Sequence, residues 1–347
     1  MKLLLSAMSA VSLLTMTILY AFGLPADVAH ISFIPAWLLF MLVVGLPLAF
    51  IDAVIIRRTQ LLPLQGLAPL TRDSDAKTTW RLLAPLAMCS LVLLMGYSAQ
   101  YAKHYVAATE QMFLKESLAY LLLFFAVGFA WVGMRRLLSF VGILVPVALI
   151  IHTLSAKHTW QLQLLTPDQW QLVAITALFS SVGSVGVYAW LMTFQPLKGR
   201  AAQTILPLWL TQTTIGLLTL IVGQTTGNVD AAIYMPCAIF ALAVYAETIA
   251  TQLQAHGLKK PIALGGVLLA SIAASYLASY KVYDLVLQSL WLLTIIGFSV
   301  LMGWIMKISH VRKALNFTSE GVYNLWRVAI RLIVPLTSIW LLISLFV

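Results

Sequence analysis

The fold is decided by the stretch Phe33-Ile-Pro-Ala-Trp-Leu-Leu-Phe-Met-Leu-Val-Val-Gly-Leu-Pro-Leu-Ala-Phe-Ile-Asp-Ala-Val-Ile-Ile-Arg-Arg58. It can cross a bilayer as one helix, because ~20 helical residues span a hydrocarbon core of ~30 Å. It nevertheless contains Gly45, Pro47 and one carboxylate, Asp52, and each of these has a cost in lipid that calls for a structural or functional reason. The arginine pair at its end predicts that this end faces the cytoplasm.

The composition is that of an integral membrane protein. The chain has 347 residues, of which 61% are hydrophobic and 9% are charged, and its mean hydropathy is +0.96. Soluble domains have about a quarter of their residues charged, so that class is excluded. The net charge of +10 lies in short loops, where basic residues set topology and do not indicate nucleic-acid binding. Cys89 and Cys237 both fall in apolar stretches, so we expect neither a disulfide framework nor a thiolate metal site.

Hydropathy predicts an all-α protein with about eleven membrane spans in a single domain, residues 1–347. The spans are expected near residues 3–23, 34–56, 81–106, 117–134, 137–156, 171–194, 203–223, 232–254, 261–280, 284–306 and 322–346. The first stretch is expected to stay as a span, because it lacks a convincing signal-peptide cleavage site. Basic residues concentrate in every second loop, so the N-terminus is predicted to be cytoplasmic and Val347 external. A five-plus-five inverted repeat with one extra helix fits the number of spans.

Enzyme motifs are missing from the sequence. There is no Gly-rich phosphate loop before Lys-Ser/Thr, no His-Glu-x-x-His and no Gly-x-Ser-x-Gly. The six histidines are scattered, mostly at span ends, which is typical of interfacial residues and not of clustered metal ligands. We therefore expect a protein that is not an enzyme and that holds no cofactor.

Two carboxylates lie inside predicted spans. Asp52 precedes Arg57 and Arg58 by about a turn and a half of helix, so it is either neutralised by one of these arginines or ties down broken backbone in a neighbouring helix. Glu247 is deeper in its span, where an ionisable group must face the bundle interior or water. Both residues are candidates for supporting a helix break or for coupling to protons.

The segment Ala177-Leu-Phe-Ser-Ser-Val-Gly-Ser-Val-Gly-Val-Tyr188 combines serines and glycines in the middle of one span. It either unwinds, exposing backbone groups that bind solutes in transporters with discontinuous helices, or packs closely against a neighbouring helix. Tyr97 and Tyr101 of the third span either add hydroxyls to the same cavity or belong to the core.

Several segments, in order along most of the chain, together resemble the neurotransmitter:sodium symporter family, which has the LeuT-type fold. Residues 33–58 resemble its second helix, with Asp52 where the family usually has Glu. The other matching segments are Gly96-Tyr97-Ser98, Ser139-Phe-Val-Gly-Ile-Leu-Val-Pro146, Thr166-Pro-Asp-Gln-Trp170 with Leu178-Phe-Ser-Ser-Val-Gly183, and Trp326-Arg-Val-Ala-Ile-Arg-Leu-Ile-Val-Pro335.

The resemblance implies alternating access, sodium coupling and a substrate site at mid-membrane between helices one, three, six and eight. The substrate-binding residues would be Gly23, Tyr97, Ser180, Ser181 and Gly183.

The chain departs from the family at its sodium sites. Only Phe22-Gly-Leu-Pro25 remains of the family's first-helix motif. Asparagine occurs at 228, 316 and 324 and not in helices one or seven, where the first sodium site needs it. Phe240 and Ala241 stand where the second site needs side-chain oxygens, which sodium requires and these residues do not offer. Sodium is thus implied by the resemblance, but its usual ligands are absent.

Two classes of function are expected. The first is a secondary transporter of an amino acid, an amine or a similar small solute, uncoupled from sodium or driven by protons through Asp52 or Glu247. The second is a transporter-fold protein that no longer transports and acts as an interaction or sensing subunit. The expected partners are a small molecule and the lipid bilayer, with a homodimer left open. The expected location is the bacterial inner (plasma) membrane.

Overall fold

The computed structural model describes residues 2–22, 32–105, 112–155, 164–181, 186–194, 199–226 and 231–347. Every regular element in these ranges is helical, which confirms the all-α class. The elements are α1 (Lys2–Ala21), α2 (Phe33–Phe40), η1 (Met41–Gly45), α3 (Leu46–Thr59), α4 (Pro63–Asp73), η2 (Thr78–Leu82), α5 (Leu83–Tyr105), α6 (Met112–Val132), α7 (Met134–Ser155), α8 (Pro167–Ser180), α9 (Val187–Met192), α10 (Ala201–Thr226), α11 (Ala231–Ala255), α12 (Lys260–Leu277), α13 (Val282–Val300), η3 (Leu301–Ile305), α14 (Ile308–Leu315), α15 (Glu320–Val328), η4 (Ala329–Ile333) and α16 (Val334–Ser344).

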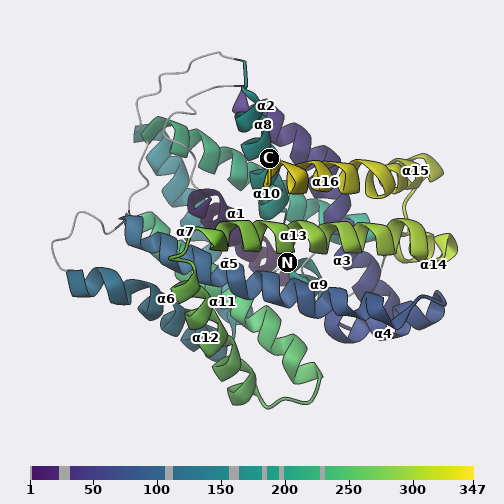
Figure 1. The fold of residues 1–347 in the computed structure, drawn as a ribbon, viewed down its shortest axis with the longest axis horizontal. Helices are drawn as coiled ribbons and strands as arrows, with labels where there is room; N and C mark the ends of the chain where they lie inside the picture. Colours follow the sequence, from purple (N-terminus) through teal and green to yellow (C-terminus); the bar gives the residue numbers. More distant parts are fainter. Residues whose placement is uncertain are drawn as a thin grey trace.

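Within the described ranges, 9 helices are long and apolar enough to cross a membrane. The other two predicted spans correspond to α6, whose apolar part Ser117–Val132 is shorter, and to α8 with α9, which form an interrupted span. Hydropathy did not predict α4 and α14. They are short amphipathic helices that lie at the same side of the bundle in Figure 1. Their polar faces keep them below any hydropathy threshold for a span.

Helix α1 lies in the middle of the bundle (Figure 1). It packs against α7, α10 and α11, and all of its residues from Ser9 to Ala21 are buried. The hydroxyls of Ser9, Ser12 and Thr15 each donate to the carbonyl four residues back at 2.8 Å. Because the helix is largely apolar and these hydroxyls are satisfied internally, it can be surrounded by other helices.

The second span widens from α-helical to π-helical geometry in η1, just before Pro47. Proline has no N–H and its ring clashes with the carbonyl four residues back, which accounts for the widening. Tryptophans of other spans bond to carbonyls of this stretch. Trp209 Nε1 donates to Met41 O at 3.1 Å, and Trp326 Nε1 donates to Pro47 O at 3.1 Å. The irregular part of the second span is therefore tied to α10 and α15.

The last span, like the second, has a π-helical turn just before a proline. The π-helical turn η4 comes directly before Val334 and Pro335, as η1 comes before Leu46 and Pro47. The two π-helical turns pack against each other. Each proline thus explains a local widening, and the two widened stretches adjoin in the bundle.

The basic turns lie together at one end of the bundle, where hydrogen bonds connect them. We call this end the basic end. Arg57 Nε donates to Ala314 O at 2.9 Å, and its Nη2 donates to Gly199 O. Gln65 Nε2 donates to Ala255 O. These bonds join the turns that follow the second, sixth, eighth and tenth spans.

The turn between α6 and α7 and the α14 region also belong to the basic end. Lys260 Nζ donates to Trp131 O at 2.7 Å, next to that turn. Lys307 forms an ion pair of 2.9 Å with Asp75, and its hydrogen bond and positive charge lower the pKa of the Asp75 carboxyl. Clustering of the basic turns at one end is the arrangement that the positive-inside rule requires.

Candidate functional site

The span formed by α8 and α9 is interrupted in the interior of the bundle. A capping box fixes the start of α8: Thr166 N donates to Gln169 Oε1 at 2.9 Å, and Gln169 N donates to Thr166 Oγ1 at 3.4 Å. The helix ends at Ser180, and helical structure resumes at Val187. Of the two alternatives for the Ser/Gly segment, the structure therefore shows an interrupted helix.

Gly186 is required where the chain re-enters helical structure. Its φ of +84° lies in the left-handed region that disfavours side chains. A Cβ at this position would also lie 3.1 Å from Pro63 Cγ and 3.3 Å from Gln252 Nε2. Backbone conformation and close packing against α4 and α11 therefore both require glycine here.

Asp52 holds the start of α9. It is fully buried, and its Oδ2 accepts a hydrogen bond from Ala189 N at 3.2 Å. The amides of Gly186 and Tyr188 also face the carboxylate. Because an acceptor at a helix start satisfies amides that have no partner within the helix, Asp52 acts as a cap supplied by another span.

Arg57 and Arg58 do not neutralise Asp52, in contrast to the first alternative from the sequence. Arg57 bonds to the carbonyls of the basic end, and Arg58 pairs with Asp73 at 3.0 Å. Their side chains point toward the loops, whereas Asp52 points into the bundle toward α9. Asp52 Oδ1 has no hydrogen-bond partner among the described residues.

Gln212 of α10 connects the two halves of the interrupted span. Its Nε2 donates to Ser180 O at the end of α8, and its Oε1 accepts from Tyr188 Oη at 2.6 Å. All three residues are buried. A carbonyl and a hydroxyl that would be costly to bury alone are thus satisfied by one amide side chain.

Both predicted serines lie against the second span, and their hydroxyls donate to carbonyls of α8. Ser180 Oγ donates to Ala177 O at 3.0 Å and lies 3.4 Å from Met41 Sδ. Ser181 Oγ donates at 2.8 Å to a carbonyl of its own helix. A Cβ on Gly45 would lie 3.3 Å from Ser181 Cβ, so the glycine of the second span permits this close approach.

Aromatic rings from four helices meet beside the end of α8. Phe22 lies 5.0 Å from Tyr97 and 4.3 Å from Phe179, measured between ring centroids. Phe179 stacks on Trp291 at 4.8 Å, and Tyr97 stacks on Tyr101 at 6.4 Å. We call these five residues the aromatic cluster. It joins the end of α1 to α5, α8 and α13.

Buried polar atoms without partners accompany the aromatic cluster. Tyr234 Oη donates to Ser98 O at 2.9 Å, and its ring meets Tyr20 at 6.3 Å. Tyr20 Oη, Ser98 Oγ and Trp291 Nε1 are buried and have no hydrogen-bond partner in the described part of the chain. Buried polar groups in native proteins nearly always have partners, so these three atoms are candidates for hydrogen bonds to a bound molecule.

Glu247 lies away from both of these features. Its Oε2 accepts from Met134 N at 2.5 Å, at the start of α7. This places Glu247 beside the turn between α6 and α7, which belongs to the basic end. Met134 is the first residue of α7, so its amide has no acceptor within that helix, and the Glu247 carboxylate supplies one.

The structure brings only part of the predicted substrate site together. Gly23 and Gly183 lie outside the described residues. Tyr97 belongs to the aromatic cluster together with Phe179, whereas Ser180 and Ser181 contact the second span and bond to carbonyls of α8.

Sequence reasoning missed Gln212, Phe179 and Trp291. The only signal for Gln212 was an amide in an apolar stretch, and such amides rarely stand in spans without a partner.

The two positions of α11 where the resemblance places sodium ligands, Phe240 and Ala241, carry no side-chain oxygen. Phe240 packs its ring on Phe129 at 5.0 Å, and Ala241 has no side-chain oxygen. Cys237 Sγ lies 3.6 Å from Met16 Sδ, so sulfur atoms meet between these two helices. Sodium is a hard cation that binds oxygen, and these side chains do not supply it.

Comparison with solved structures shows the fold. A crystal structure of MhsT in complex with L-phenylalanine superposes with a TM-score of 0.71, covering 99% of this chain and 98% of that chain at 14% sequence identity. The chain has the LeuT-type fold. No protein-family model and no curated protein sequence matches it. The superposition establishes the LeuT-type fold. Because the sequence identity is this low, the substrate has to be argued from the site.

Replacing Gln212 by Leu is expected to destabilise the protein by about 3 kcal/mol, because Ser180 O and Tyr188 Oη each lose a buried partner worth ~1–3 kcal/mol. Tyr188→Phe, which leaves the Gln212–Ser180 bond intact, should cost about 1 kcal/mol. Chemical denaturation in mixed micelles measures both. Gln254→Leu is the matched control, since Gln254 bonds only within α11. Equal stability of the two leucine variants would contradict a bridging role for Gln212.

Proposed function

We propose that this protein is a secondary transporter that moves an amino acid or a similar small solute by alternating access. The observation behind this proposal is the break between α8 and α9. Backbone groups freed at such a break bind the charged ends of small solutes in transporters of this architecture. Here side chains from α3 and α10 hold the two ends of the break, so it is a built feature of the fold.

The proposed substrate position adjoins the aromatic cluster. The rings offer apolar surface, and the unpartnered atoms of Tyr20, Ser98 and Trp291 offer hydrogen bonds. Such a mixture of apolar walls and a few polar groups is typical of sites for small molecules. The phenylalanine bound in the MhsT crystal structure supports an amino acid as the substrate class.

Transport is proposed to be independent of sodium. This rests on the side chains at Phe240 and Ala241, which offer no oxygen ligand. A proton gradient is the proposed alternative driving force, with Asp52 as the carrier. Asp52 is buried at the break, and one of its oxygens has no partner among the residues that the structure describes, whereas Glu247 lies near the basic end. The proposed location is the bacterial inner membrane with a cytoplasmic N-terminus.

Uptake into proteoliposomes tests this function. Radiolabelled amino acids and amines are offered with a sodium gradient, with a pH gradient, or with neither. We expect accumulation that follows the pH gradient and is unchanged when sodium is replaced by potassium. Tyr97→Phe should lower substrate affinity about fivefold, as expected for one lost hydrogen bond of ~1 kcal/mol. Tyr120→Phe on α6 is the control and should not change it.

Two outcomes would overturn the proposal in different ways. Sodium-stimulated uptake would show that oxygen ligands come from elsewhere in the chain. Absence of uptake and of substrate binding under all gradients, with the protein shown to be folded, would favour a non-transporting interaction or sensing subunit.

A further inference from the structure

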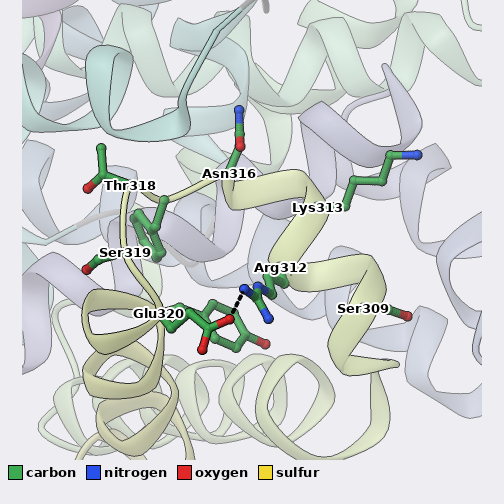
Figure 2. A pocket seen from close by; sticks show the side chains of 9 residues that line it. Ser309, Arg312, Lys313, Asn316, Thr318, Ser319 and Glu320 are labelled. Atoms are coloured by element: carbon green, nitrogen blue, oxygen red, sulfur yellow. Dashed lines mark hydrogen bonds and ion pairs between the residues drawn. The ribbon is translucent and has the colours of Figure 1, made fainter.

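A polar pocket lies between α14 and α15 at the basic end. It has a volume of about 440 Å³ and is lined by Ser309, Arg312, Lys313, Asn316 and Thr318, among others. Figure 2 shows the ion pair between Arg312 and Glu320 crossing from one helix to the other, with Lys313 pointing away from it. The pocket is therefore open and is crossed by an ion pair between its two helices.

The charge around this pocket is positive. Glu320 is its only carboxylate and is already paired with Arg312. The charges of Arg327 and Arg331 act on Tyr323 in the pocket wall, together with that of Arg312. Lys313 has no ion-pair partner in the described ranges. An anionic group would meet an uncompensated positive field here.

An apolar groove adjoins the pocket. It has a volume of about 560 Å³ and runs between the second span, α10 and α15, where Leu42, Leu206 and Leu325 are exposed. It shares Phe317 and Thr318 with the polar pocket. Because its walls belong to membrane spans, the groove faces the hydrocarbon of the bilayer.

Basic residues flank the junction of groove and pocket. Arg200 is the only charged residue of the groove, and Lys313 belongs to the pocket. Their chain neighbours, Gly199 and Ala314, both bond to the guanidinium of Arg57. The backbone next to Arg200 and the backbone next to Lys313 are therefore tied to the same arginine side chain.

A second lipid-facing groove shows that this charge is not a general property of the surface. That groove has a volume of about 440 Å³, is equally apolar, and includes Cys89, Leu253 and Ala270. No charged residue lines it. Of these two grooves, only the one beside α15 is suited to a ligand with an apolar chain and an anionic head.

We propose that an anionic phospholipid binds at the basic end, with an acyl chain in the apolar groove and its phosphate at the junction of groove and pocket, in the positive field to which Arg200 and Lys313 contribute. Thr318 lies where the two parts of the site meet and can donate to a phosphate oxygen. The cytoplasmic leaflet, which the positive-inside rule assigns to this end, is the leaflet that is rich in anionic lipid.

Native mass spectrometry of the detergent-purified protein with phosphatidylglycerol or phosphatidylcholine tests the headgroup. Each basic residue near the lipid surface contributes ~1 kcal/mol, so Arg200→Gln with Lys313→Gln should weaken phosphatidylglycerol binding about 30-fold. Arg136→Gln with Lys259→Gln removes the same charge from other loops of the basic end and should leave binding unchanged. Phosphatidylcholine should bind weakly to all three proteins.

The groove is tested separately. Ala202→Phe places a ring in the groove and should reduce retention of phosphatidylglycerol, while Ala270→Phe fills the charge-free groove and should not. Glycerol phosphate without acyl chains should not compete at millimolar concentration. If both charge variants lose phosphatidylglycerol binding equally, the lipid is attracted by the general surface charge and not by this site. If Ala202→Phe retains phosphatidylglycerol like the unchanged protein, the acyl chain does not occupy the groove. Either result overturns the proposal.

Discussion

Asp52→Ala is expected to destabilise the protein by about 5 kcal/mol and to abolish transport. The carboxylate accepts from Ala189 N and faces the amides of Gly186 and Tyr188, all within the bundle. Without it, the buried N–H of Ala189 loses a charged acceptor, at ~1–3 kcal/mol, and the start of α9 loses a favourable negative charge, at up to ~2 kcal/mol. Denaturation in mixed micelles measures the loss of stability, and uptake into proteoliposomes measures the loss of function.

Asp52→Asn separates the cap from the charge. The amide oxygen still accepts from Ala189 N, so we expect most of the stability to remain. If Asp52 carries the coupling proton, this variant should exchange substrate across the membrane but no longer accumulate it with a pH gradient. Equal destabilisation by Asn and Ala would contradict the capping role.

Gly186→Val should be the second most harmful change, at about 4 kcal/mol. A left-handed backbone costs ~1–2 kcal/mol for a residue with a Cβ, and forcing atoms into a packed site costs a further ~1–3 kcal/mol. The packing part comes from Pro63 and Gln252, which lie against the position of a Cβ. Loss of stability and of substrate binding should occur together, because α9 would shift.

Gly257→Val is the matched control for this experiment. Gly257 has a similar backbone conformation, with φ of +95°, but nothing lies within 4 Å of where its Cβ would be. It should therefore show the backbone cost alone, ~1–2 kcal/mol. The difference between the two valine variants isolates the packing contribution at the break. If that difference is zero, the contact with Pro63 and Gln252 has no energetic role.

The sequence allowed much of the fold to be predicted because lipid imposes simple rules. A run such as residues 33–58 can only be a helix in a bilayer, and its proline had to disturb that helix. The alternation of basic loops predicted that Arg57, Lys260 and Lys307 would lie at the same end of the bundle. Contacts between their loops confirm this. Local patterns sufficed for these features.

The candidate site could be predicted only in part. The Ser/Gly composition of residues 177–188 left unwinding and close packing equally open, because both use small residues. The partner of Glu247 could not be predicted, since a position in a span does not reveal that the neighbouring helix begins at Met134. Gln212 gave no pattern, because its partners Ser180 and Tyr188 belong to another helix.

By itself, then, the sequence determined an all-helical membrane protein, the approximate position of its spans and their distribution of charge, because these follow from hydropathy and from local backbone chemistry. Only the tertiary structure decided that Asp52 faces α9 and not its neighbouring arginines, and that Gln212 closes the helix break. It also decided that aromatic rings from four helices meet beside that break. A buried polar group can be satisfied by any helix that packs against it, and which helix does so is fixed by packing across the whole bundle.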